Sequence, residues 1–123
     1  MAATKATAQR GDDTRLLDFI REKVDTFVKW DLVRFFHDNP YAADSAENIA
    51  RFAGRDARTV DRELQELVRS GVVEAYVAGN GNMQIYRYVK DQQIRDAVQS
   101  FVIACDDREF RVRAINQVIE GLQ

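Results

Sequence analysis

The sequence of 123 residues has few of the residues that build disulfides or metal sites. It contains one cysteine, Cys105, one histidine, His37, and one proline, Pro40. A lone cysteine forms no internal disulfide, and one histidine with one cysteine falls short of the three or four ligands that a zinc site recruits. We therefore expect no metal and no other cofactor.

Long apolar runs are also missing. No run of about 18 apolar residues occurs, and no apolar stretch follows a basic start, so the sequence predicts neither a membrane span nor a secretion signal. A cytoplasmic protein without a membrane partner is the expectation. The sequence contains no Gly-rich phosphate loop, paired-histidine site or nucleophile elbow, and we expect a protein that is not an enzyme.

An excess of basic residues is absent as well. The chain has 18 Lys and Arg against 20 Asp and Glu, a formal net charge of −2, and a pI of about 5.4. Residues 1–43 and 44–90 each carry seven acids and seven bases, so the acidic excess lies in residues 91–123. Nucleic-acid-binding domains usually present a basic face. Such a face would have to come from the arrangement of charges and not from their number.

What the sequence does contain is a series of local signals between Asp44 and Val89. Asp44 is suited to cap a helix that Gly54 ends in the left-handed conformation. Asp56 is suited to cap a second helix, which stops at Gly71. The apolar residues of that second helix recur at helical spacing: Val60, Leu64, Leu67 and Val68. The turn of about three residues between the two helices is the length expected of a helix-turn-helix.

The flanking segments complete one expected domain over residues 12–123, with residues 1–11 as a disordered arm. Helical periodicity from Asp12 to Asn39 predicts one long helix, or two with a kink near Asp25-Thr26. Strands are predicted at 72–77 and 84–89, joined by Gly79-Asn80-Gly81-Asn82, which is typical of a tight hairpin turn. Two more helices are predicted over 91–122, the second capped by Asp106.

A resemblance to a known family rests on residues 58–73, which run Arg-Thr-Val-Asp-Arg-Glu-Leu-Gln-Glu-Leu-Val-Arg-Ser-Gly-Val-Val. This segment resembles the recognition helix and the entry to the wing of winged helix-turn-helix transcription regulators, in the broad sense that includes the ArsR-like and MarR-like groups. The resemblance covers about residues 32–89. It implies a mainly α fold with a small β-hairpin and extra N- and C-terminal helices. It also implies sequence-specific binding to double-stranded DNA.

The predicted recognition helix has an arginine-rich face. At about 100° per residue, its exposed side collects Arg58, Arg62, Gln65 and Arg69. Arginine pairs with guanine or phosphate, and glutamine pairs with adenine in the major groove. The full predicted DNA-binding set is Arg55, Arg58, Thr59, Arg62, Gln65, Arg69, Asn80, Asn82 and Arg87.

The alternative is a winged-helix module that binds another protein and not DNA. Three features favour it: the neutral charge of the motif, the uncharged hairpin tip, and the acids at positions 61, 63 and 66. The arginines would then be solvated side chains paired with acids of their own helix, such as Arg62 with Glu66.

The C-terminal helices carry more apolar residues than a small domain easily covers, which predicts a homodimer interface. The predicted interface residues are Ile94, Val98, Phe101, Val112, Ile115 and Ile119. The alternative is that these helices fold back on Leu16, Ile20 and Val24 as part of a monomeric core. A small-molecule effector is a further expected partner, in a cavity lined by Phe27, Trp30 and Phe101.

Overall fold

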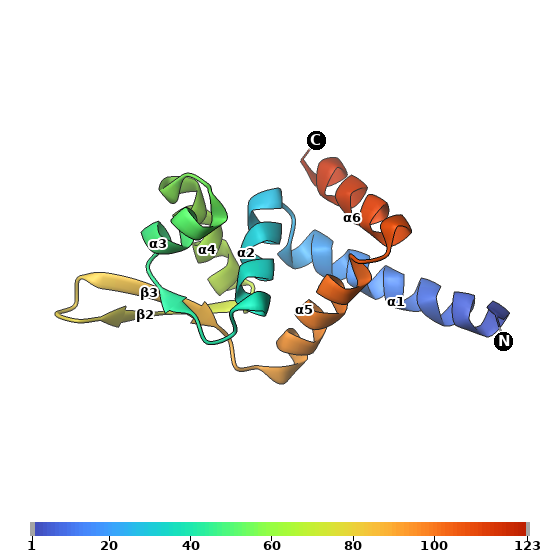
Figure 1. Cartoon of the computed structure of the whole chain (residues 1–123), viewed down its shortest axis with the longest axis horizontal. Coiled ribbons are helices and arrows are strands. Elements are labelled where there is room, and N and C mark those ends of the chain that lie inside the picture. Colours follow the sequence, from blue (N-terminus) through green and yellow to red (C-terminus); the bar gives the residue numbers. More distant parts are fainter. Residues whose placement is uncertain (1, 123) are drawn as a thin grey trace.

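The computed structural model describes the backbone of residues 2–122 and the side chains of residues 13–122. This part of the chain forms six helices and a three-stranded antiparallel sheet, arranged as an elongated body with the hairpin at one end (Figure 1). The elements are α1 (Ala2–Lys23), α2 (Phe27–Asp38), β1 (Ala43–Asp44), α3 (Ala46–Ala53), α4 (Ala57–Arg69), β2 (Val73–Ala78), β3 (Met83–Tyr88), α5 (Gln92–Ala104) and α6 (Arg108–Gly121). None of the described helices is both long and apolar enough to cross a membrane.

The first helical pattern forms two helices, separated at the predicted kink. Thr26 has extended backbone angles, and its hydroxyl caps α2 by accepting the backbone N–H of Lys29 at 3.1 Å. The helix ends at Asp38, close before Pro40, as expected where the residue preceding a proline leaves the helical region. The kinked alternative is therefore confirmed.

The first residues of α1, which begins at Ala2, belong to the segment 1–11 that the sequence predicts as a disordered arm. The side chains of residues 2–12 lie outside the described residues, and the arm stays a prediction. Met1 lies outside the described residues.

The residues that begin and end α3 and begin α4 agree with the sequence prediction at two positions and differ at one. Gly54 has φ 65° and ends α3, and the Asp56 carboxylate caps α4 by accepting the backbone N–H of Thr59 at 3.0 Å. Both predictions are confirmed. The cap of α3, however, is Ser45, whose Oγ accepts the backbone N–H of Asn48 at 3.3 Å. Asp44 instead accepts the backbone N–H of Ser45 and the side-chain amide of Asn48, each at 2.8 Å.

The hairpin lies within one residue of its predicted position. Strands β2 and β3 pair from Val73↔Tyr88 to Ala78↔Met83, and Gly79 and Gly81 supply the positive φ that the turn requires. Strand β1 pairs with β3, so the sheet order is β1-β3-β2. The sequence did not predict β1, because two residues are too few to show an alternating pattern.

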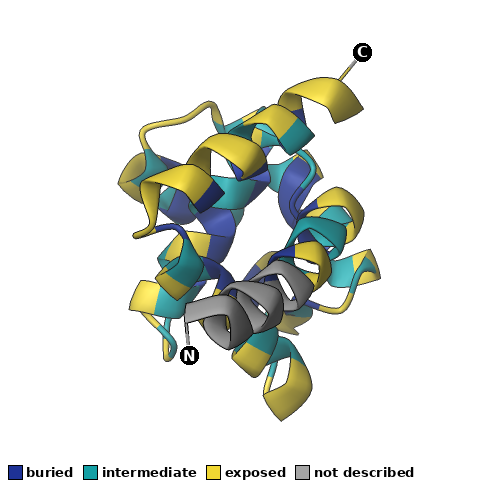
Figure 2. Ribbon diagram, turned by 90° about the vertical axis from the view of Figure 1, so that its right-hand side faces the viewer, coloured by how far each residue is buried: buried dark blue, intermediate teal, exposed yellow. Residues whose placement is uncertain are grey.

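One continuous core joins the terminal helices to the base of the hairpin. Helix α2 packs against α4 and α5, while α1 packs against α6 and α5. Figure 2, seen from the side of the N-terminus, shows that the buried residues of the helices face the interior of the molecule and that the exposed residues face outward. The largest fully buried side chains include Ile20, Leu32, Phe36, Ile49, Leu64, Tyr86, Phe101 and Phe110.

A buried cation, Lys29, ties α2 to α4. Its Nζ lies 2.6 Å from Asp25 Oδ1, 2.8 Å from Glu66 Oε1 and 3.8 Å from Glu63 Oε2. The side chains of Lys29 and Glu63 are only 6% and 7% exposed, and the Thr26 hydroxyl donates to Glu63 Oε1 at 2.8 Å. Burial by itself lowers the pKa of Lys29, but hydrogen bonds to Asp25 and Glu66 outweigh it and raise the pKa. The hydrogen bond from Lys29 to Glu66 is also the main cause of the lowered pKa of Glu66.

Replacing Lys29 by methionine is expected to lower the free energy of unfolding by about 3 kcal/mol, because the Glu63 carboxylate then stays buried without a counter-ion. The pH dependence has a definite sign. Since folding lowers the pKa of Glu66, its contribution is present above the ordinary value of 4.5 and disappears as the pH falls through the folded value.

Urea denaturation at neutral and acidic pH measures both effects, with the exposed Lys90→Met variant as the control. Wild-type protein should lose more stability on acidification than Lys29→Met. Equal unfolding free energies for the two variants at neutral pH would contradict the prediction.

Candidate nucleic-acid interface

Helix α4 presents a stripe of polar side chains opposite its buried face. Val60, Leu64 and Leu67 are fully buried, whereas the opposite side of the helix is exposed. The four exposed side chains, here called the α4 stripe, are Arg58, Arg62, Gln65 and Arg69. At about 100° per residue they fall within an arc of about 60°, and at 1.5 Å rise per residue they extend along about 16 Å of helix.

The three arginines of the α4 stripe form no salt bridge among the described residues. In particular, the pair of Arg62 with Glu66 considered from the sequence does not form, because Glu66 bonds to Lys29. Hydrogen bonds are the main cause of the lowered pKa of both Asp56 and Glu66, but at longer range the charge of Arg58 contributes to the first shift and the charge of Arg69 to the second. The stripe is therefore a row of three arginines without salt bridges and one amide.

Two other predicted DNA contacts are paired with acids. Both Nε and Nη2 of Arg55 lie 2.8 Å from Asp31 Oδ2. Arg87 Nε lies 2.9 Å from Glu74 Oε1, with its guanidinium 4.7 Å from the Tyr76 ring centroid. Because side chains alternate along a strand, Arg87 lies on the face of the sheet opposite Tyr86, whose hydroxyl reaches α4. The structure therefore does not bring Arg87 to the α4 stripe.

Acids of α4 and its cap hold Thr59 and Gln65. Asp56 Oδ2 accepts both the backbone N–H and the hydroxyl of Thr59, at 3.0 and 3.2 Å. These hydrogen bonds, the backbone one first, lower the pKa of Asp56. Gln65 Nε2 donates to Asp61 Oδ2 at 2.9 Å. The amide nitrogen carries a second N–H, so Gln65 can keep this bond when it pairs with a base.

Asp61 also anchors the hairpin to α4. Its Oδ1 accepts the Tyr86 hydroxyl at 3.1 Å. Burial, followed by the charge of Asp61, raises the pKa of Tyr86 to about 12. Asp61 thus bonds to both Gln65 and Tyr86, and the second of these bonds links the hairpin to α4.

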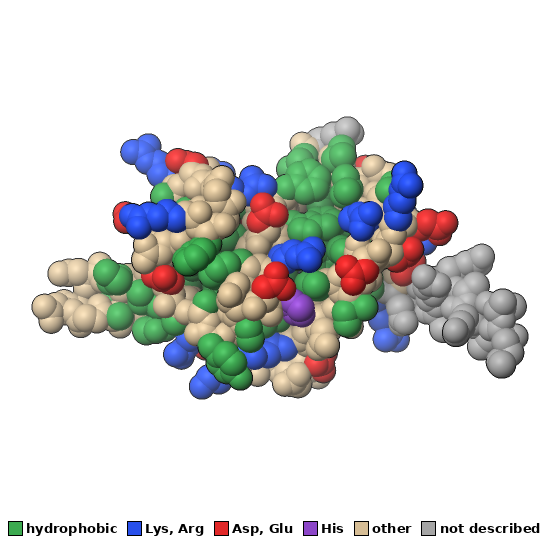
Figure 3. All heavy atoms as spheres, in the orientation of Figure 1, with side chains coloured by type: hydrophobic (Ala, Val, Ile, Leu, Met, Phe, Trp, Pro, Cys, Tyr) green, Lys and Arg blue, Asp and Glu red, His purple; other side chains and the backbone are tan. Residues whose placement is uncertain are grey.

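The hairpin tip carries no charge. Asn80 and Asn82 are exposed there, as are Val77 and Met83 beside them. In Figure 3 the outer half of the hairpin shows only hydrophobic and neutral polar atoms, whereas arginine and lysine side chains stand out around α3 and α4. Asn80 and Asn82 lie at the outer end of the hairpin, apart from the α4 stripe (Figure 1).

Phe52 lies on the outside of α3, although the apolar residues of this helix, Phe52 among them, are expected from the sequence to face inward. Its side chain is 76% exposed and its ring lies 5.9 Å from that of Phe35. The core-facing side of the short helix α3 is occupied by Ile49 and Ala50, and Phe52 falls at the edge of that arc.

The predicted dimer-interface residues fall into two groups. Val98 and Phe101 are buried in the core of the single chain, with the Phe101 ring 5.1 Å from Trp30, and they are therefore not available to a partner. Ile94 and Ile115 are half-buried, and Val112 and Ile119 are 49% and 43% exposed. This corrects two of the six predicted residues.

The exposed group continues along one side of α6. Its members recur at three- and four-residue spacing and are called the α6 stripe: Val112, Ile115, Ile119 and Leu122. Ala114 and Val118 on another side of the helix are buried. Figure 3 shows hydrophobic side chains gathered over α6. The cap of α6 is Asp107, which accepts the backbone N–H of Phe110 at 3.2 Å, and not the predicted Asp106.

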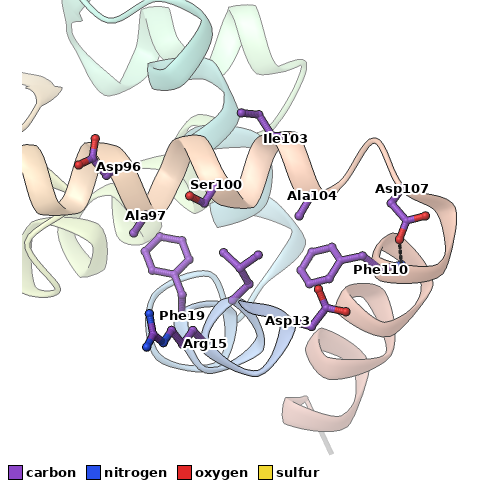
Figure 4. Close-up of a pocket in the computed structure, with 11 residues that line it drawn as sticks. Asp13, Arg15, Phe19, Asp96, Ala97, Ser100, Ile103, Ala104, Asp107 and Phe110 are labelled. Atoms are coloured by element: carbon purple, nitrogen blue, oxygen red, sulfur yellow. Dashed lines mark hydrogen bonds between the residues drawn. The ribbon is translucent and has the colours of Figure 1, made fainter. Parts of the chain in front are cut away.

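A groove of about 540 Å³ lies between α1, α5 and α6 (Figure 4). The Trp30 and Phe101 rings, which were expected to line the effector cavity, instead pack on each other, with their centroids 5.1 Å apart. The groove is lined by Asp13, Arg15, Leu16, Phe19, Asp96, Ala97, Ser100, Ile103, Ala104, Asp107 and Phe110. Most of these residues lie on α1 and α5, where no motif had singled them out. The described residues hold no group of three or more potential metal ligands.

Together, the helices and the small antiparallel sheet make a mainly helical fold with a β-hairpin. No protein-family model and no curated protein matches the sequence. Among solved structures, the chain is similar to a protein from Methanosarcina mazei Go1 named as a possible transcriptional regulator. The two share 20% identity with a TM-score of 0.51, over 83% of this chain and 82% of that one. At this identity the likeness is one of fold.

Replacing Tyr86 by phenylalanine is expected to lower the free energy of unfolding by about 1 kcal/mol, because it removes the hydrogen bond to Asp61. Tyr76→Phe is the matched control, since no hydrogen bond of the Tyr76 hydroxyl is present among the described residues. Thermal unfolding compares the two. Because the folded state raises the pKa of Tyr86, its contribution is present below the ordinary value of 10.0 and is lost as the pH rises through about 12. Equal stability of both variants would contradict the prediction.

Proposed function

We propose that the chain is a winged helix-turn-helix protein that binds double-stranded DNA sequence-specifically as a homodimer and regulates transcription. The observation that carries this proposal is the α4 stripe, whose three arginines form no salt bridge among the described residues, on the helix that follows the Gly54 turn. The fold similarity to a protein named as a possible transcriptional regulator supports it. We propose that the protein acts by binding and not by catalysis.

In the proposed complex, α4 enters the major groove with its exposed stripe toward the bases. Arg58 and Arg62 are nearest the N-terminal end of the helix, which usually contacts base edges in helix-turn-helix proteins. Bidentate bonds from arginine to guanine are the commonest specific contact. Arg69, at the other end of the stripe, and Thr59 and Arg55, at the start of α4, would contact phosphates and set the register.

The hairpin would contribute less than the helix. Asn80 and Asn82 can bond to phosphate or sugar but add no charge, and Arg87 stays with Glu74 on the other face of the sheet. Arg55 would exchange Asp31 for a phosphate, which costs the existing ion pair. Specificity therefore rests on α4.

The proposed homodimer forms through the α6 stripe. An exposed apolar stripe on one helix normally marks an interface, and a two-fold axis brings the same residues of both copies together. Such a pair would place two α4 helices about 34 Å apart, one turn of the duplex. We also propose that a small-molecule effector binds in the groove between α1, α5 and α6.

A second candidate function is a protein-interaction module without DNA binding. The observation that favours it is the hairpin, whose exposed Val77 and Met83 and uncharged tip suit a protein surface better than a phosphate backbone. The two functions differ in their dependence on salt, because release of counter-ions from DNA weakens binding as salt rises.

Arg58→Ala and Arg62→Ala are each expected to weaken specific duplex binding by about 1–3 kcal/mol, because each removes a base or phosphate contact, and to leave folding nearly unchanged. Arg108→Ala, an exposed arginine of α6, removes the same charge far from α4 and is the control. Fluorescence anisotropy with duplexes selected from genomic DNA, over a series of salt concentrations, measures the effect. If no duplex is bound in a salt-dependent way, with or without ligand, the interaction module replaces the DNA-binding proposal.

Replacing both Val112 and Ile119 by glutamate is expected to convert the dimer to a folded monomer, because two like charges then meet in an apolar contact. Light scattering distinguishes the monomer mass of 14.1 kDa from twice that value. Val118→Glu is the matched control, since Val118 lies in the chain's own core and its replacement should unfold the protein. A wild-type mass of one chain at all concentrations would exclude the dimer.

A further inference from the structure

We propose that the groove between α1, α5 and α6 binds an amphipathic organic monocation, such as an ammonium or phosphonium ion with an apolar body. This inference deepens the proposed regulatory function, because it names the chemical class of the effector. It rests on three properties of the groove: its apolar walls, its charge balance, and the position of its charged groups.

The walls of the groove suit an apolar ligand body. Leu16 and Phe19 of α1 face Ala97 and Ala104 of α5 across it, and Phe110 of α6 closes one end (Figure 4). The volume of about 540 Å³ lies within the range of small-molecule sites, which are mostly apolar with a few placed polar groups.

The charge balance of the lining favours a cation. Three carboxylates and one guanidinium, that of Arg15, line the groove among the described residues, and because Asp13 is paired with Arg113, the carboxylates of Asp96 and Asp107 remain against Arg15. Asp96 and Asp107 accept hydrogen bonds from neutral groups, the Gln92 side-chain amide at 2.8 Å and the Phe110 backbone N–H at 3.2 Å. Neither hydrogen bond cancels the charge of its carboxylate. An anionic ligand of the same shape would be repelled by this arrangement.

The charged groups are distributed unevenly along the groove. Asp13, Asp107 and Phe110 lie at one end, while Arg15 and Asp96 lie at the other (Figure 4). The Asp13 side chain is only 7% exposed and pairs with Arg113 at 2.9 Å. A ligand cation at this end would approach Asp107, which is exposed and forms no salt bridge among the described residues. Its apolar body would then extend between Phe19 and Ala97.

Tetraphenylphosphonium and tetraphenylborate test the charge preference directly, because the two ions have nearly the same shape and opposite charge. Isothermal titration of each into the full chain, without DNA, is expected to show the cation binding at least about tenfold more tightly. Equal or tighter binding of the borate would overturn the proposal.

Two pairs of variants then locate the site. Asp107→Asn removes a charge but keeps a residue that caps helices well, so α6 should remain intact. It should weaken cation binding about fivefold, whereas Asp106→Asn, at the exposed neighbouring position outside the lining, should not. Ser100→Trp fills the groove and should abolish binding, whereas Gln99→Trp, exposed and outside the lining, should preserve it. Equal losses within either pair would overturn the proposal.

A second copy of the chain is the competing occupant of the groove. If Ser100→Trp changes the mass by light scattering and leaves cation binding intact, the groove belongs to an interface and the proposal fails. Duplex binding without the cation is measured separately. Loss of duplex binding with retained cation binding would refute the DNA-binding function alone, and the reverse result would refute the groove assignment alone.

Discussion

The buried charge cluster around Lys29 is the interaction on which the rest of the structure depends. It joins the α1–α2 junction to α4 and uses Glu63 and Glu66, two of the acids of α4, on the inner side of the helix. The third acid, Asp61, is engaged by Tyr86 and Gln65. Because these acids bond inward or sideways, the exposed arginines of the α4 stripe form no salt bridges with them. Removing one member of such a buried cluster is costly, so the arrangement is strongly maintained.

The positive face of α4 therefore results from the separation of its acidic and basic side chains, and not from the net charge of the chain. The chain is slightly acidic as a whole, yet one helix face is positive because its acids are used elsewhere. The same principle weakens the other predicted contacts. Asp31 compensates Arg55 and Glu74 compensates Arg87, so the turn and the hairpin present less free positive charge than their sequences indicate. The proposed DNA-binding surface is accordingly narrow and centred on α4.

The groove and the α4 stripe are connected through packed side chains. Phe19 of the groove wall contacts Phe101 of α5, and Phe101 packs edge-on against Trp30 of α2. Trp30 adjoins Lys29, which holds α4. A ligand that moved α1 against α5 would thus act on the helix that carries the Lys29 cluster. A packed core resists gradual deformation, so such a shift would pass to α4 as a change between discrete arrangements.

The sequence by itself determined the features that depend on residues close together in the chain, such as helix caps, turns and the exposed face of a helix. Gly54, Asp56 and the glycines of the hairpin act through their own backbone, and the spacing of Arg58, Arg62 and Arg69 places them together on one face of any α4 helix. Only tertiary structure decided what depends on partners distant in sequence: the two-residue strand β1, the acids that compensate Arg55 and Arg87, and the outward position of Phe52. Val98 and Val112 illustrate the difference. Both are apolar residues of amphipathic helices, and periodicity alone does not say that α5 turns Val98 into the chain's own core while α6 leaves Val112 exposed. That outcome depends on which helix packs on which.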